Sequence, residues 1–374
     1  MEESVVDRVM LSSVQLDGKK FLSFFPKVAY CIAYGSGVFS QTSVPSSSSP
    51  PMLDFIFAVD DPESWHTENL RLNPSHYNFL AAAGGGRWIA KLQDSSTLGA
   101  RVWFNTLVPV PPCAILSSGS DASIVPQRLM KYGVVSNGAL VEDLTHWSAL
   151  YLAGRMHKPV RVLSDDSKED DSPGSPLLAT AIHQNLQAAL SAALLTLPTS
   201  GTTTTPPTTT TTFSSLQLYA AVAGLSYAGD WRMRFGEDPN KVANIALGSL
   251  SAFHALYSPF FCKPPFSSIL SVLGGPETPY PDFTMDSSRA ARFQLGLGLP
   301  LTIQRDLSLL TAMSTAAADG TDVSSRRLGD ILSRKVAASS RAQGIMGLIT
   351  AGPTKAAIYA GAKLGKALRG MLRK

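Results

Sequence analysis

Residues able to bind a nucleotide gather around two apolar runs near the N-terminus. Tyr34-Gly35-Ser36-Gly37 directly follows the apolar residues 29–33, and Asp54 lies in the next β-rich run, residues 53–59. A strand that ends in Gly-Ser-Gly presents backbone N–H groups and a hydroxyl where no Cβ obstructs a triphosphate. A carboxylate on the next strand could hold Mg²⁺ at those phosphates. The pattern therefore predicts a nucleotide and Mg²⁺ site at Gly35, Ser36, Gly37 and Asp54, with an ordinary strand–helix turn as the alternative.

This order of turn and acidic strand is similar to the layout of the nucleotidyltransferase superfold, which usually carries a second carboxylate two residues after the first. In this chain that position is Ile56. Asp60 shares the face of Asp54 but lies about 20 Å along an extended strand, at roughly 3.3 Å per residue. We therefore expect the second metal ligand to come from elsewhere, with Asp143 as the candidate. The alternative for Asp143 is an acidic residue in the first turn of a helix.

A sheet must position these residues, and the first 163 residues contain its strands. Residues 1–163 are predicted to form an α/β domain with a mixed, mostly buried sheet. Its β-rich runs are 29–33, 53–59, 102–108, 130–135 and 160–163.

A mainly helical second domain is predicted over residues 177–318, after an acidic linker at 164–176. Its helical patterns cover 177–197, 215–228, 240–257 and 301–318. Low-complexity composition indicates solvated loops at three places. These are the Ser/Pro stretch 43–51, the acidic stretch 164–176 and the Thr/Pro stretch 199–212.

Charge is distributed unevenly along the 374 residues, whose net charge is +4. Residues 326–374 hold eleven basic residues and one acidic residue, so this tail carries +10 and the rest of the chain −6. A negative body argues against nucleic-acid binding, which needs a cationic track. The tail is therefore expected to address any anionic surface that the protein meets.

Composition also limits the cellular compartments in which the protein could reside. Three cysteines are too few for a disulfide framework, which indicates a reducing environment. No apolar run approaches the 18 or more residues of a membrane span. The acidic N-terminus resembles neither a secretory signal nor a transit peptide, so any import signal is expected to have been removed already.

A helical projection of residues 353–374 separates basic from apolar side chains. A helix with one basic and one apolar face is typical of segments that lie on anionic lipid. We therefore predict a basic, amphipathic membrane-docking tail over 323–374. A solvated helix or a calmodulin-type target is the alternative. The residues predicted to contact the membrane are Lys355, Lys363, Leu364, Lys366, Leu368, Arg369, Leu372 and Arg373.

Over about residues 30–260 the chain resembles the mitochondrial translocator assembly and maintenance proteins, a family of mitochondrial phosphatidate cytidylyltransferases. Several motifs carry the resemblance in order along the chain. They are Tyr34-Gly35-Ser36-Gly37-Val38, Met52-Leu53-Asp54-Phe55, Val59-Asp60-Asp61-Pro62, Trp65-His66, Asn69-Leu70, His76-Tyr77, Lys131-Tyr132-Gly133-Val134, Tyr151-Leu152-Ala153-Gly154-Arg155, Lys158-Pro159-Val160 and Gly224-Leu225-Ser226-Tyr227-Ala228-Gly229-Asp230.

The resemblance implies transfer of CMP from CTP to phosphatidic acid, giving CDP-diacylglycerol and pyrophosphate for phosphatidylglycerol and cardiolipin synthesis. It implies that the Gly35–Gly37 turn cradles the triphosphate, that Asp54 holds Mg²⁺ and that Lys131 neutralises a phosphate. Arg155 and Lys158 would grip the lipid phosphate, although a solvated turn is the alternative for this pair.

The resemblance further implies a nucleotidyltransferase-fold first domain, a winged-helix-like second domain and a peripheral location on the matrix side of the mitochondrial inner membrane. Two other functions stay open. One is a nucleotidyltransferase with a different acceptor, and the other is a non-catalytic membrane factor that supports protein-translocase assembly. The oligomeric state is not predicted.

Overall fold

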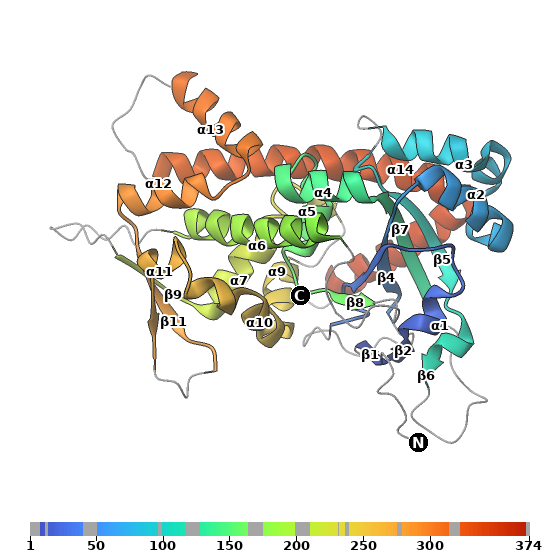
Figure 1. Cartoon of the computed structure of the whole chain (residues 1–374), viewed down its shortest axis with the longest axis horizontal. Coiled ribbons are helices and arrows are strands. Elements are labelled where there is room, and N and C mark those ends of the chain that lie inside the picture. The colour runs from blue at the N-terminus through green and yellow to red at the C-terminus, as the bar shows by residue number, and fades with distance from the viewer. Residues whose placement is uncertain are drawn as a thin grey trace.

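The computed structural model places most of the chain (Figure 1). It describes residues 8–11, 14–39, 51–95, 99–116, 128–163, 175–198, 210–230, 232–235, 239–274, 279–313 and 322–371. Within these ranges only the backbone is described for residues 8–14, 234–235, 309–313, 322–324 and 351–371.

A five-stranded mixed sheet forms one end of the molecule (Figure 1). Its order is β5 (Trp103–Pro109), β7 (Leu129–Ser136), β4 (Leu53–Val59), β3 (Tyr30–Tyr34) and β8 (Arg161–Leu163). Strands β4 and β7 are parallel, and the other neighbouring pairs are antiparallel. These strands lie where the β-rich runs predicted them, and the mixed α/β class with a mixed sheet is confirmed.

Successive side chains of a strand point to opposite faces of the sheet. Because the strands here are apolar almost throughout, both faces of the sheet are apolar and each packs against a core. Ile32, Ile56 and Phe104 face a large core shared with the helices that follow the sheet in sequence. Phe55 and Tyr132 face a second core. The elements closest in sequence to the strands are α1 (Gly18–Leu22), α2 (Pro62–Leu72), α3 (Phe79–Asp94), α4 (Asn137–His146), α5 (Leu152–Met156), the short sheet of β1 (Arg8–Leu11), β2 (Val14–Asp17) and β6 (Ile115–Leu116), and the turns η1 (Pro74–His76) and η2 (Pro112–Ala114).

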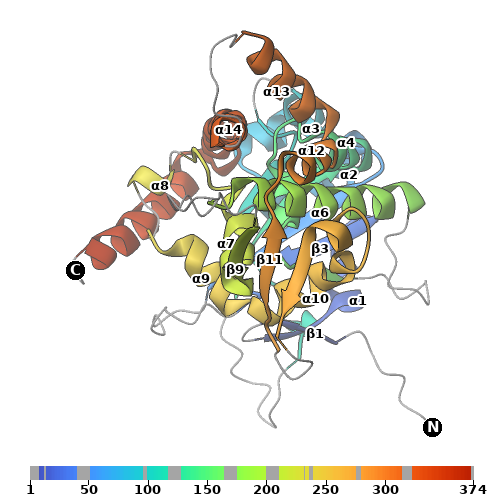
Figure 2. The same ribbon diagram turned by 90° about the vertical axis from the view of Figure 1, so that its left-hand side faces the viewer.

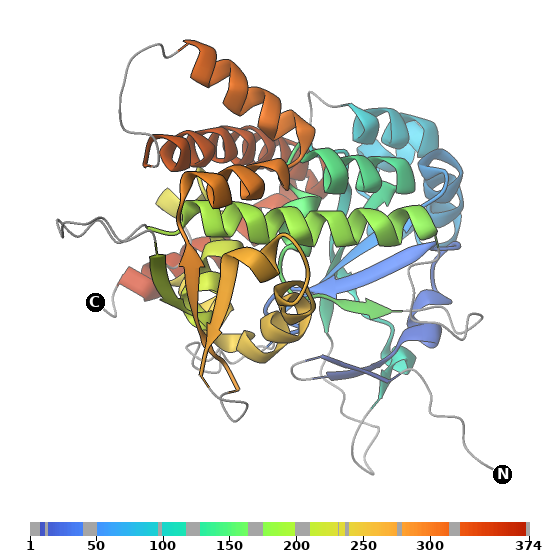
Figure 3. The ribbon, with the colours of Figure 1, turned by 60° about the vertical axis from the view of Figure 1, so that its left-hand side comes forward.

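Helix α6 (Pro176–Thr196) runs through the middle of the molecule (Figure 3) and joins the sheet to the remaining helices. It is buried on several sides because it contacts α4, α7, α12 and α14. The later elements are α7 (Ser215–Gly224), α8 (Arg232–Phe235), α9 (Lys241–Gly248), α10 (Leu250–Phe261), α11 (Phe266–Ile269), α12 (Arg289–Leu297), α13 (Leu301–Met313), and the three strands β9 (Thr210–Ser214), β10 (Leu270–Leu273) and β11 (Asp282–Asp286).

Two expectations for this region are corrected. Thr210–Thr212, assigned to a solvated stretch, belong to strand β9, which pairs with β11. The single helix expected over 240–257 is two helices, because Ser249 leaves helical geometry at φ −127° between α9 and α10. The nucleotidyltransferase and winged-helix assignments and the domain boundaries stay predictions. Residues 164–174 of the linker lie outside the described residues.

Helix α14 (Asp322–Met371) begins as part of the folded body. The Gln343 side chain donates to Val102 O at 3.2 Å and accepts from Ala100 N at 3.2 Å, which ties α14 to the start of edge strand β5. Asn78, the N-cap of α3, donates to the carbonyls of Ile349 at 2.5 Å and Thr350 at 3.0 Å.

The Ile349 carbonyl needs this outside donor. Four residues later stands Pro353, which lacks the N–H that would normally bond to it. Proline is also a usual cause of sharp helix bends, and Figure 2 shows α14 nearly end-on in its first part and then bent toward the C-terminus. The half of the predicted tail up to Thr350 therefore packs on protein. In the described part of the chain, we find no helix long and apolar enough to cross a membrane.

Candidate active site

Three adjacent strands bring Tyr34, Asp54 and Lys131 side by side. Tyr34 is paired with Asp54 across β3 and β4, and Asp54 with Lys131 across β4 and β7. Directly opposed residues of neighbouring strands project from the same face of a sheet. On the far side of β7, strand β5 bulges between Asn105 and Val108, opposite Lys131. Such bulges redirect side chains at sheet edges and are frequent beside active sites.

The glycine turn lies directly against Asp54. Gly35 has φ +84°, which favours glycine, and its carbonyl accepts from Val38 N and Phe39 N at 3.0 Å each. A Cβ added to Gly35 would lie 3.3 Å from Asp54 Oδ2, and one added to Gly37 only 2.7 Å from Met52 O. The turn and the carboxylate predicted to act together are therefore neighbours. Residues 40–50, which include most of the Ser/Pro stretch predicted to be a solvated loop, lie outside the described residues.

Arg155, on α5, reaches the same place and is held between two aromatic rings. Its Cζ lies 4.4 Å from the ring centre of Tyr34 and 5.0 Å from that of Tyr151, and it donates to the Tyr151 hydroxyl at 3.1 Å. Burial alone would lower the pKa of Arg155, but Tyr34, Tyr151 and Asp54 raise it. Its buried Nε has no hydrogen-bond partner among the described residues. A fixed guanidinium with a spare donor is well suited to a phosphate.

Two lysines complete the predicted set. Lys131 Nζ lies 4.0 Å above the ring centre of Phe104, and burial is the main cause that lowers its pKa. Lys158 Nζ donates to Gly154 O and, at 2.6 Å, to Ser226 Oγ. Burial, then the nearby charges of Arg155 and Lys241, lowers the pKa of Lys158 to about 7. Neither lysine has a carboxylate within ion-pair distance in the described part of the chain, so both are placed for an anion from outside.

The structure adds residues to which the sequence analysis gave no role in the site. Arg232, paired with Asp230 at 2.5 Å between Nη2 and Oδ2, acts electrostatically on Lys131, Arg155 and Tyr151. Burial would raise the pKa of Tyr151, but Arg155, Lys131 and Arg232 lower it. The spacing of Tyr151 and Arg155, four residues apart, is a signal that could have indicated their contact.

We call these residues the cationic cluster: Lys131, Arg155, Lys158, Arg232 and Lys241. Within the described residues, the electrostatic neighbours that oppose them are the carboxylates Asp54 and Asp230 together with tyrosines. Such an excess of half-buried positive charge raises the local concentration of polyanions. The arrangement can bind several phosphates at once, beside a carboxylate.

Asp143 does not belong to this site, and its prediction as a metal ligand is corrected. Its carboxylate is buried and accepts hydrogen bonds from the backbone N–H groups of residues 149–153, at 2.8–3.1 Å. These bonds occupy both oxygens, so the side chain holds a turn together rather than offering itself to an ion. More widely, the described residues contain no group of three or more His, Cys, Asp or Glu side chains that could hold a metal.

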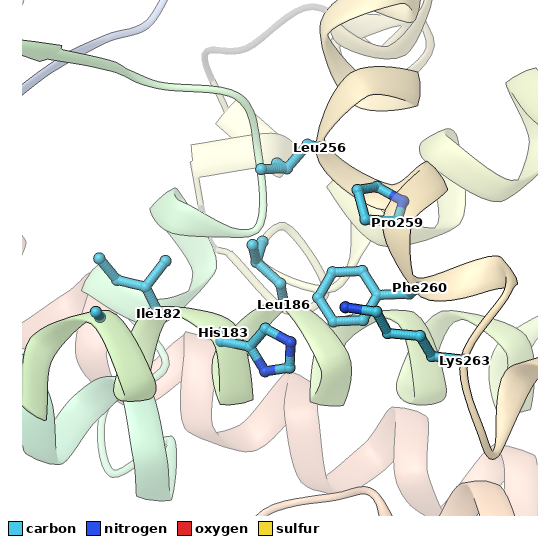
Figure 4. Close-up of a pocket in the computed structure, with 8 residues that line it drawn as sticks. Ile182, His183, Leu186, Leu256, Pro259, Phe260 and Lys263 are labelled. Carbon is cyan, nitrogen blue, oxygen red and sulfur yellow. The ribbon is translucent and has the colours of Figure 1, made fainter. Parts of the chain in front are cut away.

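A separate pocket of about 330 Å³ lies between α6 and α10 (Figure 4). In the close-up, His183 of α6 faces the ring of Phe260 from α10, with the ring centres 5.0 Å apart. No member of the cationic cluster lines this pocket, so the candidate active site is the cluster beside the Gly35 turn instead. The lining residues are Ala179, Ile182, His183, Leu186, Leu256, Pro259, Phe260 and Lys263.

The predicted membrane contacts cannot be placed as side chains. Lys355, Lys363, Leu364, Lys366, Leu368 and Arg369 lie on the part of α14 described by its backbone alone. Leu372 and Arg373 lie outside the described residues. Their role stays a prediction.

Comparisons with known proteins agree over nearly the whole chain. A family model described as "Phosphatidate cytidylyltransferase, mitochondrial" matches residues 18–366. Relatives that carry this same name come from Xenopus laevis, 37% identical over 367 residues and covering 95% of each chain, and from Danio rerio, 36% identical over 367 residues and covering 95% of this chain and 96% of the relative. The relative from Bos taurus is 35% identical over 380 residues, which is 97% of this chain and 99% of its own.

Proposed function

The chain belongs to the family of mitochondrial phosphatidate cytidylyltransferases, and on that premise we propose that it transfers CMP from CTP to phosphatidic acid, with CDP-diacylglycerol and pyrophosphate as products. The observation that carries the proposal is the meeting of the Gly35 turn, Asp54 and the cationic cluster near the ends of strands β3, β4 and β7. Two substrates rich in phosphate must lie together there, and the cluster supplies the opposite charge.

The reaction asks for positioning and charge neutralisation more than for proton transfer. A phosphatidate oxygen, already anionic near neutral pH, forms a bond to the α-phosphorus of CTP while the bond from that phosphorus to the bridging β-phosphate oxygen breaks. Pyrophosphate leaves with that oxygen. No strong general base is required, and fixed cations stabilise the charge that builds up on the transferring and leaving groups.

Each part of the site has a role in this scheme. The backbone N–H groups of the Gly35–Gly37 turn hold the triphosphate. Lys131, which pairs with Asp54 across β7 and β4, neutralises the negative charge of a phosphate. Arg155 and Lys158 hold the phosphate of the lipid. The ring of Tyr34 lies against Arg155 and keeps the guanidinium directed into the site.

Mg²⁺ fits this site as an ion bound by ligands from both the protein and the substrate. Mg²⁺ is commonly bound by one or two carboxylates with the remaining positions filled by substrate phosphates and water. Asp54 is the carboxylate that lies against the glycine turn. When bound, the ion would neutralise phosphate oxygens; Asp54 would hold it.

The protein reaches its lipid substrate from the surface of the mitochondrial inner membrane, on the matrix side. The basic tail beyond Pro353 docks on anionic lipid, and the bend in α14 separates it from the packed part of the helix. Each basic residue near an anionic surface adds about 1 kcal/mol to such docking.

The test is to incubate the purified chain with CTP labelled at the α-phosphate, Mg²⁺ and vesicles containing phosphatidate. Label extracted into organic solvent as CDP-diacylglycerol supports the proposal. Matched arms omit phosphatidate, replace CTP by ATP, GTP or UTP, or replace Mg²⁺ by a chelator. Absence of lipid product from folded protein would contradict the proposal and favour the membrane-factor function, whereas label in RNA would indicate another acceptor.

A further inference from the structure

The residues proposed to grip the lipid phosphate come from one short irregular stretch, Trp147–Lys158, which we call the grip segment. Trp147 and Leu150 both have positive φ, at 50° and 51°, a region that non-glycine residues rarely adopt. Such a backbone keeps its shape only where its surroundings hold it. The positions of Arg155 and Lys158 therefore depend on whatever anchors this segment.

One anchor is Asp143 on α4, whose carboxylate binds the backbone of residues 149–153. A second anchor comes from the middle of α6. The Oδ1 atom of the fully buried Asn185 accepts from Trp147 Nε1 at 2.8 Å and is hydrogen-bonded to His157 Nε2 at 3.0 Å, while its Nδ2 donates to Ala153 O at 3.1 Å. This single side chain thus binds the segment at its start, its middle and its end.

The chemistry of these contacts is specific to an amide. Because Oδ1 can only accept, His157 must carry its proton on Nε2, and burial, then the charge of Lys158, lowers the pKa of His157 to about 3 and keeps the ring neutral. The Tyr257 hydroxyl of α10 donates to His157 O at 2.7 Å and adds a weaker hold on the same end. An apolar residue at position 185 would leave the ring N–H groups of Trp147 and His157 buried without this acceptor, and would remove one of the two hydrogen bonds that Ala153 O accepts.

We infer that Asn185 is a positioning residue for the active site: through Trp147, Ala153 and His157 it fixes the grip segment, and so sets where Arg155 and Lys158 meet phosphate. Asn185 itself touches no substrate. The inference rests on the proposed function only where turnover is measured, because binding of a phosphate compound can be measured independently. It predicts that substrate handling changes while the fold and the other substrate contacts remain.

The experiment compares Asn185→Leu, which has similar volume and no hydrogen-bonding groups, with Asn185→Asp, which keeps the acceptor oxygen. Ser191→Ala is the matched control, since Ser191 lies on the same helix, is fully buried, and its Oγ has no hydrogen-bond partner among the described residues. For Asn185→Leu we expect kcat/KM for phosphatidate to fall by about 10–100-fold, the size of effect that small misplacements produce. For Asn185→Asp we expect a loss within about threefold, and for Ser191→Ala none.

Two further readouts separate positioning from a loss of stability. Calorimetric titration with inorganic pyrophosphate should give a weaker Kd for Asn185→Leu at a temperature where its melt shows a fully folded protein. The indole N–H signal of Trp147 in an NMR spectrum, assigned with Trp147→Phe among the five tryptophans, should shift in Asn185→Leu and stay in Ser191→Ala.

Wild-type kinetic constants and pyrophosphate Kd in folded Asn185→Leu would overturn the inference, as would equal losses in Asn185→Leu and Ser191→Ala. If Asn185→Leu does not fold, Asn185→Asp is compared with Ser191→Ala instead, with an expected loss of up to about threefold and a shifted Trp147 signal in the first and neither in the second. If the wild-type protein makes no lipid product, the proposed function fails, and the pyrophosphate comparison still decides whether Asn185 positions the grip segment.

Discussion

Buried positive charge is the costly part of this site. The positive charge of Arg155 lowers the pKa of both Lys131 and Lys158, so Arg155 and each lysine disfavour one another's charge. Folded proteins keep such repulsion where binding needs it, and stability is commonly lower in consequence. Asp54 relieves part of it, because its charge raises the pKa of both Lys131 and Arg155. The carboxylate of Asp54 therefore stabilises the charged form of these cations, in addition to its proposed role as a metal ligand.

Replacing Asp54 tests its place in the site. We expect Asp54→Asn to lower kcat/KM for CTP by at least about 100-fold, the loss typical of removing a group that stabilises the charges of the reaction. Asp60→Asn is the matched control, because Asp60 follows the other end of the same strand, is exposed and binds Asn137. Near-normal turnover of Asp54→Asn would contradict the assignment of Asp54 as a metal ligand. A thermal melt equal to that of the wild-type protein would exclude unfolding as the cause of any loss.

Lys158 gives the site a pH dependence of known sign. Its pKa of about 7 means that the side chain is cationic below that pH and loses its charge as the pH rises through it. We expect kcat/KM for phosphatidate to fall by about tenfold from pH 6.5 to pH 8.5, since a hydrogen bond from a charged donor is worth about 1.5–3 kcal/mol. The measurement is a pH profile of initial rates.

The control for that profile is Lys158→Arg, whose guanidinium stays charged throughout. The lipid phosphate titrates near pH 6 in both proteins, so the ratio of their profiles isolates Lys158. Identical profiles for the two proteins would show that Lys158 does not meet the lipid phosphate.

Local sequence predicted that the Gly35 turn and Asp54 lie together, because each lies within a strand or at its end, where spacing fixes the direction of a side chain, whereas Lys131 was named only through the family resemblance. It failed at Asp143, whose hydrogen-bond partners are backbone groups of a non-repetitive turn several residues downstream. No periodicity encodes such a turn. Arg232 was not assigned to the site, because the sequence does not indicate that α8 lies close to β7 and α5.

Helices and strands show the same division between local and distant information. The apolar runs predicted β3, β4, β5, β7 and β8 within a residue or two, since a buried strand must be apolar wherever it packs. Strand β9 was missed because threonine tracts are typical of both solvated linkers and strands, and only pairing with β11 decides between them. The contact between α14 and β5 could not be predicted, because neither segment's own sequence indicates which element it packs against.

The contact between α14 and β5 can be tested by one substitution. Gln343→Leu would leave Ala100 N and Val102 O without their partners in a buried place. We expect the free energy of unfolding to fall by about 2–4 kcal/mol, at about 1–3 kcal/mol for each orphaned group. Urea denaturation measures this change.

Arg341→Ala is the control for that measurement, because Arg341 lies on the exposed face of the same helix and should alter the free energy by no more than about 0.5 kcal/mol. Equal effects of the two substitutions would mean that α14 is not clamped to the sheet through Gln343.

At the scale of the whole molecule, the proposed active site and the predicted membrane-docking tail occupy separate parts of the chain. Truncation after Gly352 retains the bonds of Asn78 and Gln343 and removes the basic segment. We expect the truncated protein to bind CTP normally, to lose flotation with cardiolipin-containing vesicles, and to turn over membrane-embedded phosphatidate more slowly. Salt should weaken the docking of the intact protein without abolishing it, since screening acts on charges and not on inserted apolar groups.

A variant with Leu364, Leu368 and Leu372 changed to Ser keeps the charge and tests insertion alone. Full flotation and full turnover by the truncated protein would mean that the membrane contact lies on the acidic body instead. Unchanged flotation of the triple-serine variant would mean that attraction between charges is sufficient for docking.

The contact made by Gln343 also affects the order in which the molecule folds. The residues that it joins stand 241 and 243 positions apart in the sequence, and contacts between such distant residues form late because a long loop must close first. Until then edge strand β5 lacks the helix that packs on it in the finished fold, and an uncovered edge strand is a template for pairing with other chains. During refolding from denaturant, loss of the Gln343 contact should therefore increase aggregation through β5.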